Sequence, residues 1–206
     1  MSGRILLKSF LAGIAISIGC IAYLSCESKF AGASLFSIGL FMVCTFDLNL
    51  YTGKVCYVFD NKPSYIFDVL TIWCGNYWGV IWTATVCNMT RLNVLAEKAT
   101  ELCQIKLNDS LSSIFLLSML CNMMIYVGVE SYKNNPHYIG KYIGIYLSVV
   151  VFIMCGFEHC IANMFYFLFA CIDDERLLLY LFAMTLGNAV GGIGIAGIHR
   201  LIRKEV

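Results

Sequence analysis

The segment Gly156–Met164, with the sequence GFEHCIANM, places Glu158 and His159 near the middle of an apolar stretch that runs from about 141 to 170. A continuous membrane helix rarely carries ionisable side chains at mid-depth, because each one costs at least about 2.5 kcal/mol there. Broken helices do carry such groups, where irregular backbone lines a cavity. The segment therefore predicts an interrupted membrane helix.

A second apolar stretch, about 32–59, contains a similar polar interruption with Asp47 and the sequence TGK at Thr52, Gly53 and Lys54. The threonine hydroxyl can donate and accept hydrogen bonds, which suits a loop that touches a solute. The glycine permits a tight backbone, and we expect it to support the break. The lysine is either a fixed positive charge beside a pore or a side chain that extends to the membrane interface.

The composition extends this interpretation to the whole chain of 206 residues, which is 60% hydrophobic and only 13% charged. A soluble domain has about 25% charged residues, and a membrane span needs about 20 apolar residues. We therefore predict a single all-α membrane domain over residues 1–206 with six transmembrane helices, of which the second and fifth are broken. The six apolar segments are about 9–25, 32–59, 65–88, 110–129, 141–170 and 177–199.

A GNxxG pattern occurs at Gly75–Gly79 and again at Gly187–Gly191, in the third and sixth apolar segments. The broken spans likewise occupy corresponding places, which predicts an inverted repeat of three plus three helices with the functional site between the halves. The repeats would cover about 1–88 and 110–206, joined by a linker at about 89–109. Helix packing alone would explain the glycines, but it would not explain why the broken spans correspond.

Charge and cysteine content exclude several other partners. The net charge is +1 and the basic residues are dispersed, so we expect no nucleic acid partner. The eleven cysteines form no CxxC pair, and we interpret them as small apolar side chains rather than metal ligands, with no cofactor expected. Lys and Arg favour the segments on the side of the termini by eight to five, which predicts a cell (inner) membrane protein with both termini cytoplasmic.

His159 is the main candidate for chemistry. Imidazole can donate a proton near neutral pH or present an N–H group to an anion. We expect Glu158 and Gly156 to support the helix break rather than to meet the solute. Lys8 and Lys106 precede the first and fourth spans, and the inverted repeat would place them at opposite mouths of a pore.

Four motifs together resemble the formate/nitrite transporter family. They are KSFLAG at Lys8–Gly13, LYTGK at Leu50–Lys54, GFEHCIANM at Gly156–Met164 and LGNAVGG at Leu186–Gly192, in the order found in that family. The resemblance covers essentially the whole chain, and the third motif is the most specific. It implies an aquaporin-like fold, a homopentamer in the lipid bilayer with one pore per protomer, and a small monovalent anion and a proton as partners.

The resemblance also implies roles for individual residues. Leu40 and Phe152 would form two apolar constrictions around the central His159. Thr52 would be the threonine of a mobile loop, and Asn188 a polar partner from the sixth span. Lys8 and Lys106 would be vestibule lysines. Lys54 departs from the family pattern, in which many members have a small or polar residue, so the substrate and the gating of the loop stay open.

These observations predict a channel or transporter for small monovalent anions or their conjugate weak acids, of the formate, nitrite and hydrosulfide class, with proton-linked passage. The alternative is a channel for a neutral solute such as water, ammonia or H2S. An intramembrane enzyme using His159 and Glu158 is disfavoured, because the neighbouring Cys160 follows no known catalytic spacing. A purely structural role would leave the ionisable residues at mid-depth unexplained.

Overall fold

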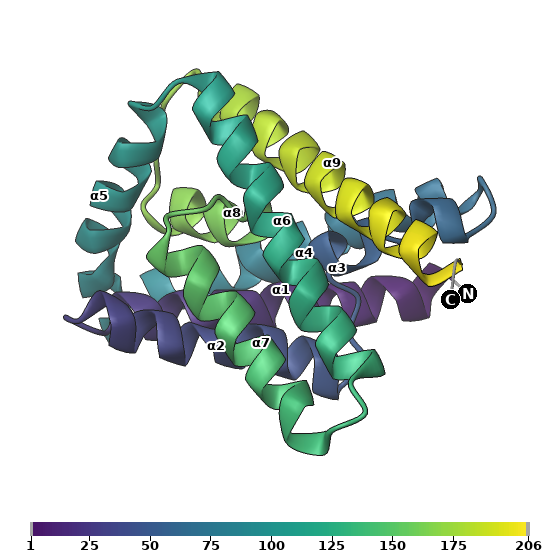
Figure 1. Cartoon of the computed structure of the whole chain (residues 1–206). Coiled ribbons are helices and arrows are strands. Elements are labelled where there is room, and N and C mark those ends of the chain that lie inside the picture. The colour runs from purple at the N-terminus through teal and green to yellow at the C-terminus, as the bar shows by residue number, and fades with distance from the viewer. Residues whose placement is uncertain (1, 205–206) are drawn as a thin grey trace.

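A computed structural model describes residues 2–204, which are helical almost throughout and contain no strand (Figure 1). The first half of the chain contains α1 (Ser2–Leu24), α2 (Lys29–Thr45), α3 (Tyr51–Val55), the 3-10 helix η1 (Val58–Asp60) and α4 (Tyr65–Asn88). The 3-10 helix η2 (Arg91–Leu95) and α5 (Ala96–Leu107) follow. The second half contains α6 (Leu111–Asn134), α7 (Tyr138–Met154), α8 (Cys160–Phe169) and α9 (Leu177–Lys204).

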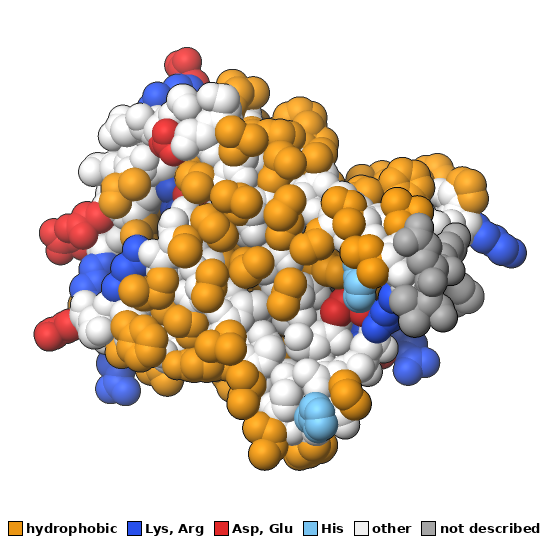
Figure 2. Space-filling model, viewed as in Figure 1, with side chains coloured by type: hydrophobic (Ala, Val, Ile, Leu, Met, Phe, Trp, Pro, Cys, Tyr) orange, Lys and Arg blue, Asp and Glu red, His pale blue; other side chains and the backbone are white. Residues whose placement is uncertain are grey.

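Three of the described helices, α1, α6 and α9, are long and apolar enough to cross a membrane, over 22, 24 and 27 residues. Helices α2, α7 and α8 are apolar but shorter. Large apolar side chains are exposed over the outside of the molecule, among them Leu178, Phe67 and Phe182. Figure 2 shows apolar side chains covering the middle of one face, with charged side chains mostly toward its margins. This distribution is typical of a protein whose outer surface faces lipid.

Close helix packing rests on the glycines of the two GNxxG patterns. A Cβ atom on Gly79 would collide with the backbone oxygen of Phe10 in α1, and one on Gly191 would collide with that of Met119 in α6. Helix α4 therefore lies directly against α1, and α9 directly against α6. Small residues permit this approach in membrane helices, where packing replaces the hydrophobic effect as the driving force.

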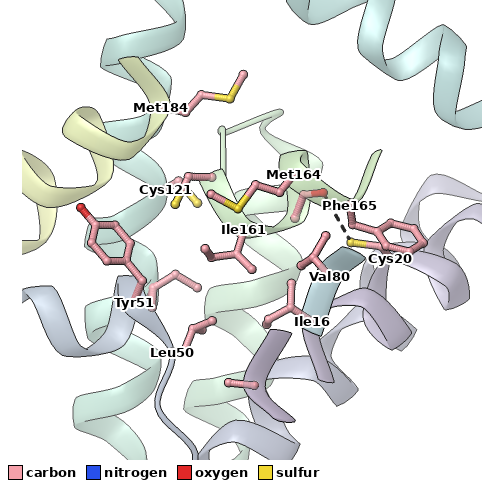
Figure 3. Close-up of a cluster of buried hydrophobic side chains, with 14 of the residues drawn as sticks. Ile16, Cys20, Leu50, Tyr51, Val80, Cys121, Ile161, Met164, Phe165 and Met184 are labelled. Carbon is pink, nitrogen blue, oxygen red and sulfur yellow. Dashed lines mark hydrogen bonds between the residues drawn. The ribbon is translucent and has the colours of Figure 1, made fainter. Parts of the chain in front are cut away.

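The core lies where the short helices α3 and α8 enter the bundle. All the large side chains of α8 except Leu168 are buried, including Phe165 and Met164. Figure 3 shows these two side chains near Cys20 of α1, Val80 of α4 and Cys121 of α6. The cysteines are all free, and six of the eleven are buried, as small apolar side chains would be.

The structure corrects the position of the first interruption. The irregular backbone spans residues 46–50, and the TGK sequence lies after it, inside helix α3. Gly53 is helical and does not have a positive φ, so the predicted tight backbone at this glycine is wrong. The second interruption, at residues 155–159, lies where the sequence predicts it, and Gly156 has a φ of 72°.

Candidate functional site

The two broken stretches present the same backbone features in the same order. Each contains one residue in the left-handed region, Asp47 with φ 48° and Gly156 with φ 72°. Two residues further on, the N–H of Asn49 donates to the carbonyl of Lys8, and that of Glu158 donates to the carbonyl of Leu117. Both breaks are therefore pinned to the helix that opens their half of the chain.

A buried asparagine clamps the first break. The N–H of Tyr51, the first residue of α3, donates to Oδ1 of Asn76 over 2.8 Å. Nδ2 of Asn76 donates to the carbonyls of Ser9 and Asn49, both at 2.8 Å. A broken helix leaves backbone groups without partners inside the protein, and this one amide satisfies two of them, the N–H of Tyr51 and the carbonyl of Asn49, while its third hydrogen bond ties the break to α1. Sequence reasoning missed Asn76, although the repeated GNxxG pattern contained the signal.

Asn188 clamps the second break in the same way. Its Oδ1 accepts from the N–H of Cys160 at 2.9 Å, and its Nδ2 donates to the carbonyls of Ser118 and Glu158 at 2.7 and 2.9 Å. Its side chain is fully buried, and its amide is occupied by backbone. The structure thus places Asn188 as a support for the break, not as the polar pore partner that the resemblance implies.

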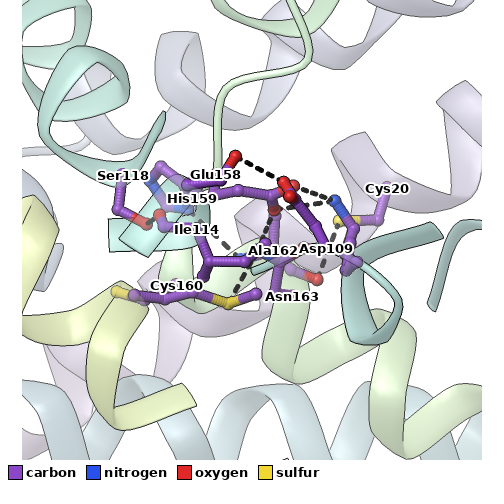
Figure 4. A network of polar contacts seen from close by, with 12 residues as sticks. Cys20, Asp109, Ile114, Ser118, Glu158, His159, Cys160, Ala162 and Asn163 are labelled. Atoms are coloured by element: carbon purple, nitrogen blue, oxygen red, sulfur yellow. Dashed lines mark hydrogen bonds and ion pairs between the residues drawn. The ribbon is translucent and has the colours of Figure 1, made fainter. Parts of the chain in front are cut away.

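His159 is the N-cap residue that immediately precedes helix α8, and it is 2% exposed. The N–H of Ala162 donates to its Nδ1 over 3.2 Å, so that nitrogen acts as an acceptor and caps the helix (Figure 4). A neutral imidazole then carries its proton on Nε2. Nε2 lies 3.0 Å from Oγ1 of the fully buried Thr52, in helix α3. The two breaks therefore meet at one side-chain contact, where the Nε2–H donates to the threonine and leaves the hydroxyl proton available to another acceptor.

Apolar side chains enclose this pair. The ring of Phe152 stacks on that of His159, with centroids 6.0 Å apart and an interplanar angle of 23°. Phe36 of α2 lies edge-on to Phe152, with centroids 5.8 Å apart. Leu40 is 1% exposed and packs close to Gly128 of α6, where a Cβ atom would lie 3.2 Å from its methyl carbon. The two residues expected to form constrictions are thus both buried.

Two cavities approach the pair. The one near the chain termini, here the near vestibule, has a volume of about 210 Å³ and is lined by Asp47, Leu50, Gly53, Lys54 and Lys133, among others. The other, here the far vestibule, has a volume of about 190 Å³ and reaches His159 and Phe152. The far vestibule is thus lined by His159 itself, whereas the near vestibule is lined by Gly53, the neighbour of Thr52 in the chain.

Each of the two predicted vestibule lysines is paired with a carboxylate. Nζ of Lys106 lies 2.7 and 3.0 Å from the carboxylate oxygens of Glu158, and this pair is largely buried, with side chains 14% and 6% exposed. Asn163 donates to the same carboxylate over 2.6 Å (Figure 4). Nζ of Lys8 lies 2.5 Å from Oδ2 of Asp47, whose side chain is 79% exposed.

Glu158 has two functions that sequence reasoning had not separated. Its backbone supports the break, as expected, while its side chain faces the far vestibule and holds Lys106. The two lysines also do not occupy corresponding helices. The residue whose carbonyl accepts a hydrogen bond from the break is Lys8 in α1 and Leu117 in α6, so these two residues correspond. Lys106 belongs instead to α5.

Together, these features define a helical membrane protein in which two broken helices meet at a buried polar pair between two vestibules. Residues 2–202 match the profile of the formate/nitrite transporter family, and the chain belongs to this family. It is 26% identical to a probable formate transporter from Methanothermobacter thermautotrophicus, over 92% of this chain and 85% of the relative. It is 25% identical to a formate channel from Bacillus thuringiensis, over 93% and 83% of the two chains.

Solved structures agree with the fold. A pentameric formate channel with formate bound superposes with a TM-score of 0.87, at 24% identity, over 100% of this chain and 98% of the other. An ion channel of the same family superposes with a TM-score of 0.83, at 19% identity, over 97% and 90% of the chains. The family and these structural neighbours are channels and transporters rather than enzymes.

Proposed function

We propose that this protein is a membrane channel for small monovalent anions or their conjugate weak acids, of the formate, nitrite and hydrosulfide class, with proton-linked passage past His159. The proposal rests on one observation: the His159–Thr52 pair is buried between two vestibules at the point where the two broken helices meet. Relatives described as formate channels or formate transporters support this substrate class.

The proposed architecture has six crossings in a single domain, with α2–α3 and α7–α8 as broken spans and an aquaporin-like inverted repeat of residues about 1–88 and 110–206. The matched asparagine clamps support the repeat. The likeness to a pentameric channel over the whole chain supports a homopentamer with one pore per protomer. The distribution of Lys and Arg supports a cell membrane location with both termini cytoplasmic.

The mechanism follows from the cost of moving charge into low dielectric. A bare anion loses its hydration between Leu40 and Phe152, whereas its conjugate acid crosses an apolar layer at much lower cost. The Thr52 hydroxyl, which accepts from His159, has its own proton free to donate to the anion. Such a donor lowers the cost of the anion until the anion takes up a proton that enters from the solvent or is released.

The test is formate uptake into proteoliposomes, measured against pH for the unmodified protein and for His159→Phe. Uptake by the unmodified protein should rise as pH falls, because the proposed passage past His159 is proton-linked and protons are then more abundant. The variant should lose about tenfold or more of the uptake. Without His159, Thr52 loses the donor that leaves its hydroxyl proton free for the anion, and a hydrogen bond to a charged group contributes about 1.5–3 kcal/mol. His137→Phe, the same change in the loop before α7, is the matched control. An unchanged pH profile in His159→Phe would remove His159 from the proposal.

One observation favours a second candidate, a channel for a neutral solute such as water, ammonia or H2S. Lys8 and Lys106 each lie against a carboxylate, so neither presents an uncompensated positive charge at its vestibule. A neutral-solute channel would give water flux that is insensitive to pH and little formate uptake. The same proteoliposomes, tested by osmotic shrinkage and by formate uptake, separate the two functions.

A further inference from the structure

The near vestibule carries more positive charge than its one carboxylate can neutralise. Lys54, Lys133 and Asp47 are the charged residues that line it. The single carboxylate is held by Lys8, at 2.5 Å from Nζ to Oδ2. Among residues 2–204, no carboxylate lies within 4.0 Å of the ammonium group of Lys54 or Lys133. Two ammonium groups thus border one cavity without an acidic partner in contact.

The position of Lys133 is fixed by an aromatic ring rather than by an acid. Its Nζ lies 4.2 Å from the ring centroid of Tyr57, a cation–π contact that orients the ammonium without cancelling its charge. The Tyr57 hydroxyl donates to Glu130 over 2.5 Å, and the other oxygen of that carboxylate accepts from Asn134 at 2.6 Å. Glu130, the nearest acid in sequence, is therefore engaged by neutral donors and not by Lys133.

The far vestibule differs in this respect. There the ammonium of Lys106 is neutralised by Glu158, with which it is largely buried. The ammonium of Lys29 donates to the carbonyl of Met154 over 3.1 Å, at the negative end of the α7 dipole. The far vestibule thus has one lysine without a carboxylate partner, Lys29, whereas the near vestibule has two.

We propose that the near vestibule is a binding site for small dianions, with short dicarboxylates as the ligand class, and that a bound dianion blocks entry of the monovalent anion from that side. This regulation rests on the proposed function, whereas the binding does not. Two cations match the two charges of a dicarboxylate, and a cavity of about 210 Å³ has room for several water molecules, and so for such a ligand. A dianion loses more hydration than a monoanion in an apolar constriction, so it stays in the vestibule.

The binding test uses isothermal calorimetry of the purified full chain with malonate as the probe and acetate as the monovalent comparison. Malonate should bind more tightly than acetate, and Lys54→Met with Lys133→Met should weaken malonate binding at least tenfold. Lys98→Met is the matched control, since this lysine donates to backbone carbonyls at the other end of the molecule, and it should stay within twofold. The double Arg variant, K54R with K133R, should retain malonate binding and shows that loss in the Met variant comes from charge rather than misfolding.

The transport test adds malonate to one side of a planar bilayer that carries formate current. Malonate should block from the side of the chain termini only, and the double Met variant should need at least tenfold more malonate for half block. Equal malonate affinity in the double Met variant, or equal block from both sides, would overturn the inference. Charge-dependent malonate binding without formate current would instead contradict the proposed function and leave the site standing.

Discussion

The two broken helices of this protein have the same backbone features but different side chains. Both have a left-handed residue and a short helix whose first N–H is held by a buried asparagine. At the residue before that helix, the first break has Leu50, with no side-chain cap, and the second has His159, which caps its own helix. The two breaks therefore share the asparagine clamp and differ in the residue that precedes the short helix.

The acids differ as well. Asp47 of the first break is largely exposed, whereas Glu158 of the second is 4% exposed and shares its carboxylate between Lys106 and Asn163. Removing either partner of a buried ion pair leaves a buried charge without compensation. We therefore expect the second break to lose more stability than the first when its ion pair is broken. The first break contributes Thr52 from a helix of five residues.

The largest expected effect tests whether both breaks depend on the same clamp. Asn188→Ala and Asn76→Ala each remove three hydrogen bonds and leave two buried backbone groups of a break unpaired, at about 1–3 kcal/mol for each group. Each should lower stability by about 2–6 kcal/mol, measured as the thermal unfolding midpoint in detergent and the yield of monodisperse protein. Asn134→Ala, which removes an exposed hydrogen bond, should change little. A large loss in one clamp variant only would mean that the breaks are supported differently.

Much of the fold could be predicted from apolar segment lengths, because lipid fixes the length of a span. The segment predicted at 65–88 is helix α4, and the break around His159 lies where ionisable residues interrupt apolar sequence. The all-helical architecture and the family are likewise confirmed by the structure and by the profile match.

The details of the first break could not be predicted, because its signal was ambiguous. Thr52, Gly53 and Lys54 are polar or flexible and resemble loop residues, yet they form a helix whose first N–H is satisfied by Asn76, far away in sequence. The left-handed residue there is Asp47, not a glycine, so composition alone did not mark it. The pairing of Lys106 with Glu158 joins residues 52 apart and depends on tertiary packing that periodicity does not encode.

The second largest expected effect compares the stability lost when each of the two ion pairs is broken. Lys106→Met leaves the buried Glu158 carboxylate without its cation, which should cost about 3 kcal/mol of stability. Lys8→Met breaks a pair whose aspartate is 79% exposed, and it should cost less than about 1 kcal/mol. Thermal unfolding in detergent at low and high salt measures both, and only the Lys8 pair should weaken with salt. Similar losses in both variants would contradict the difference in burial between the breaks.

The smallest expected effect concerns two glycines, whose replacement by alanine should change stability in opposite directions. Gly156 has a φ of 72° and open space around it, so Gly156→Ala should destabilise by about 1 kcal/mol through backbone strain alone. Gly53 is helical, and a Cβ atom there would meet Val129 at an ordinary 3.6 Å, so Gly53→Ala should stabilise by about 0.5–1 kcal/mol. Unfolding midpoints of the two variants, measured in parallel, decide the matter. Destabilisation by both would mean that the α3 backbone must leave the helical conformation in the folded protein, as a mobile loop carrying Thr52 would require.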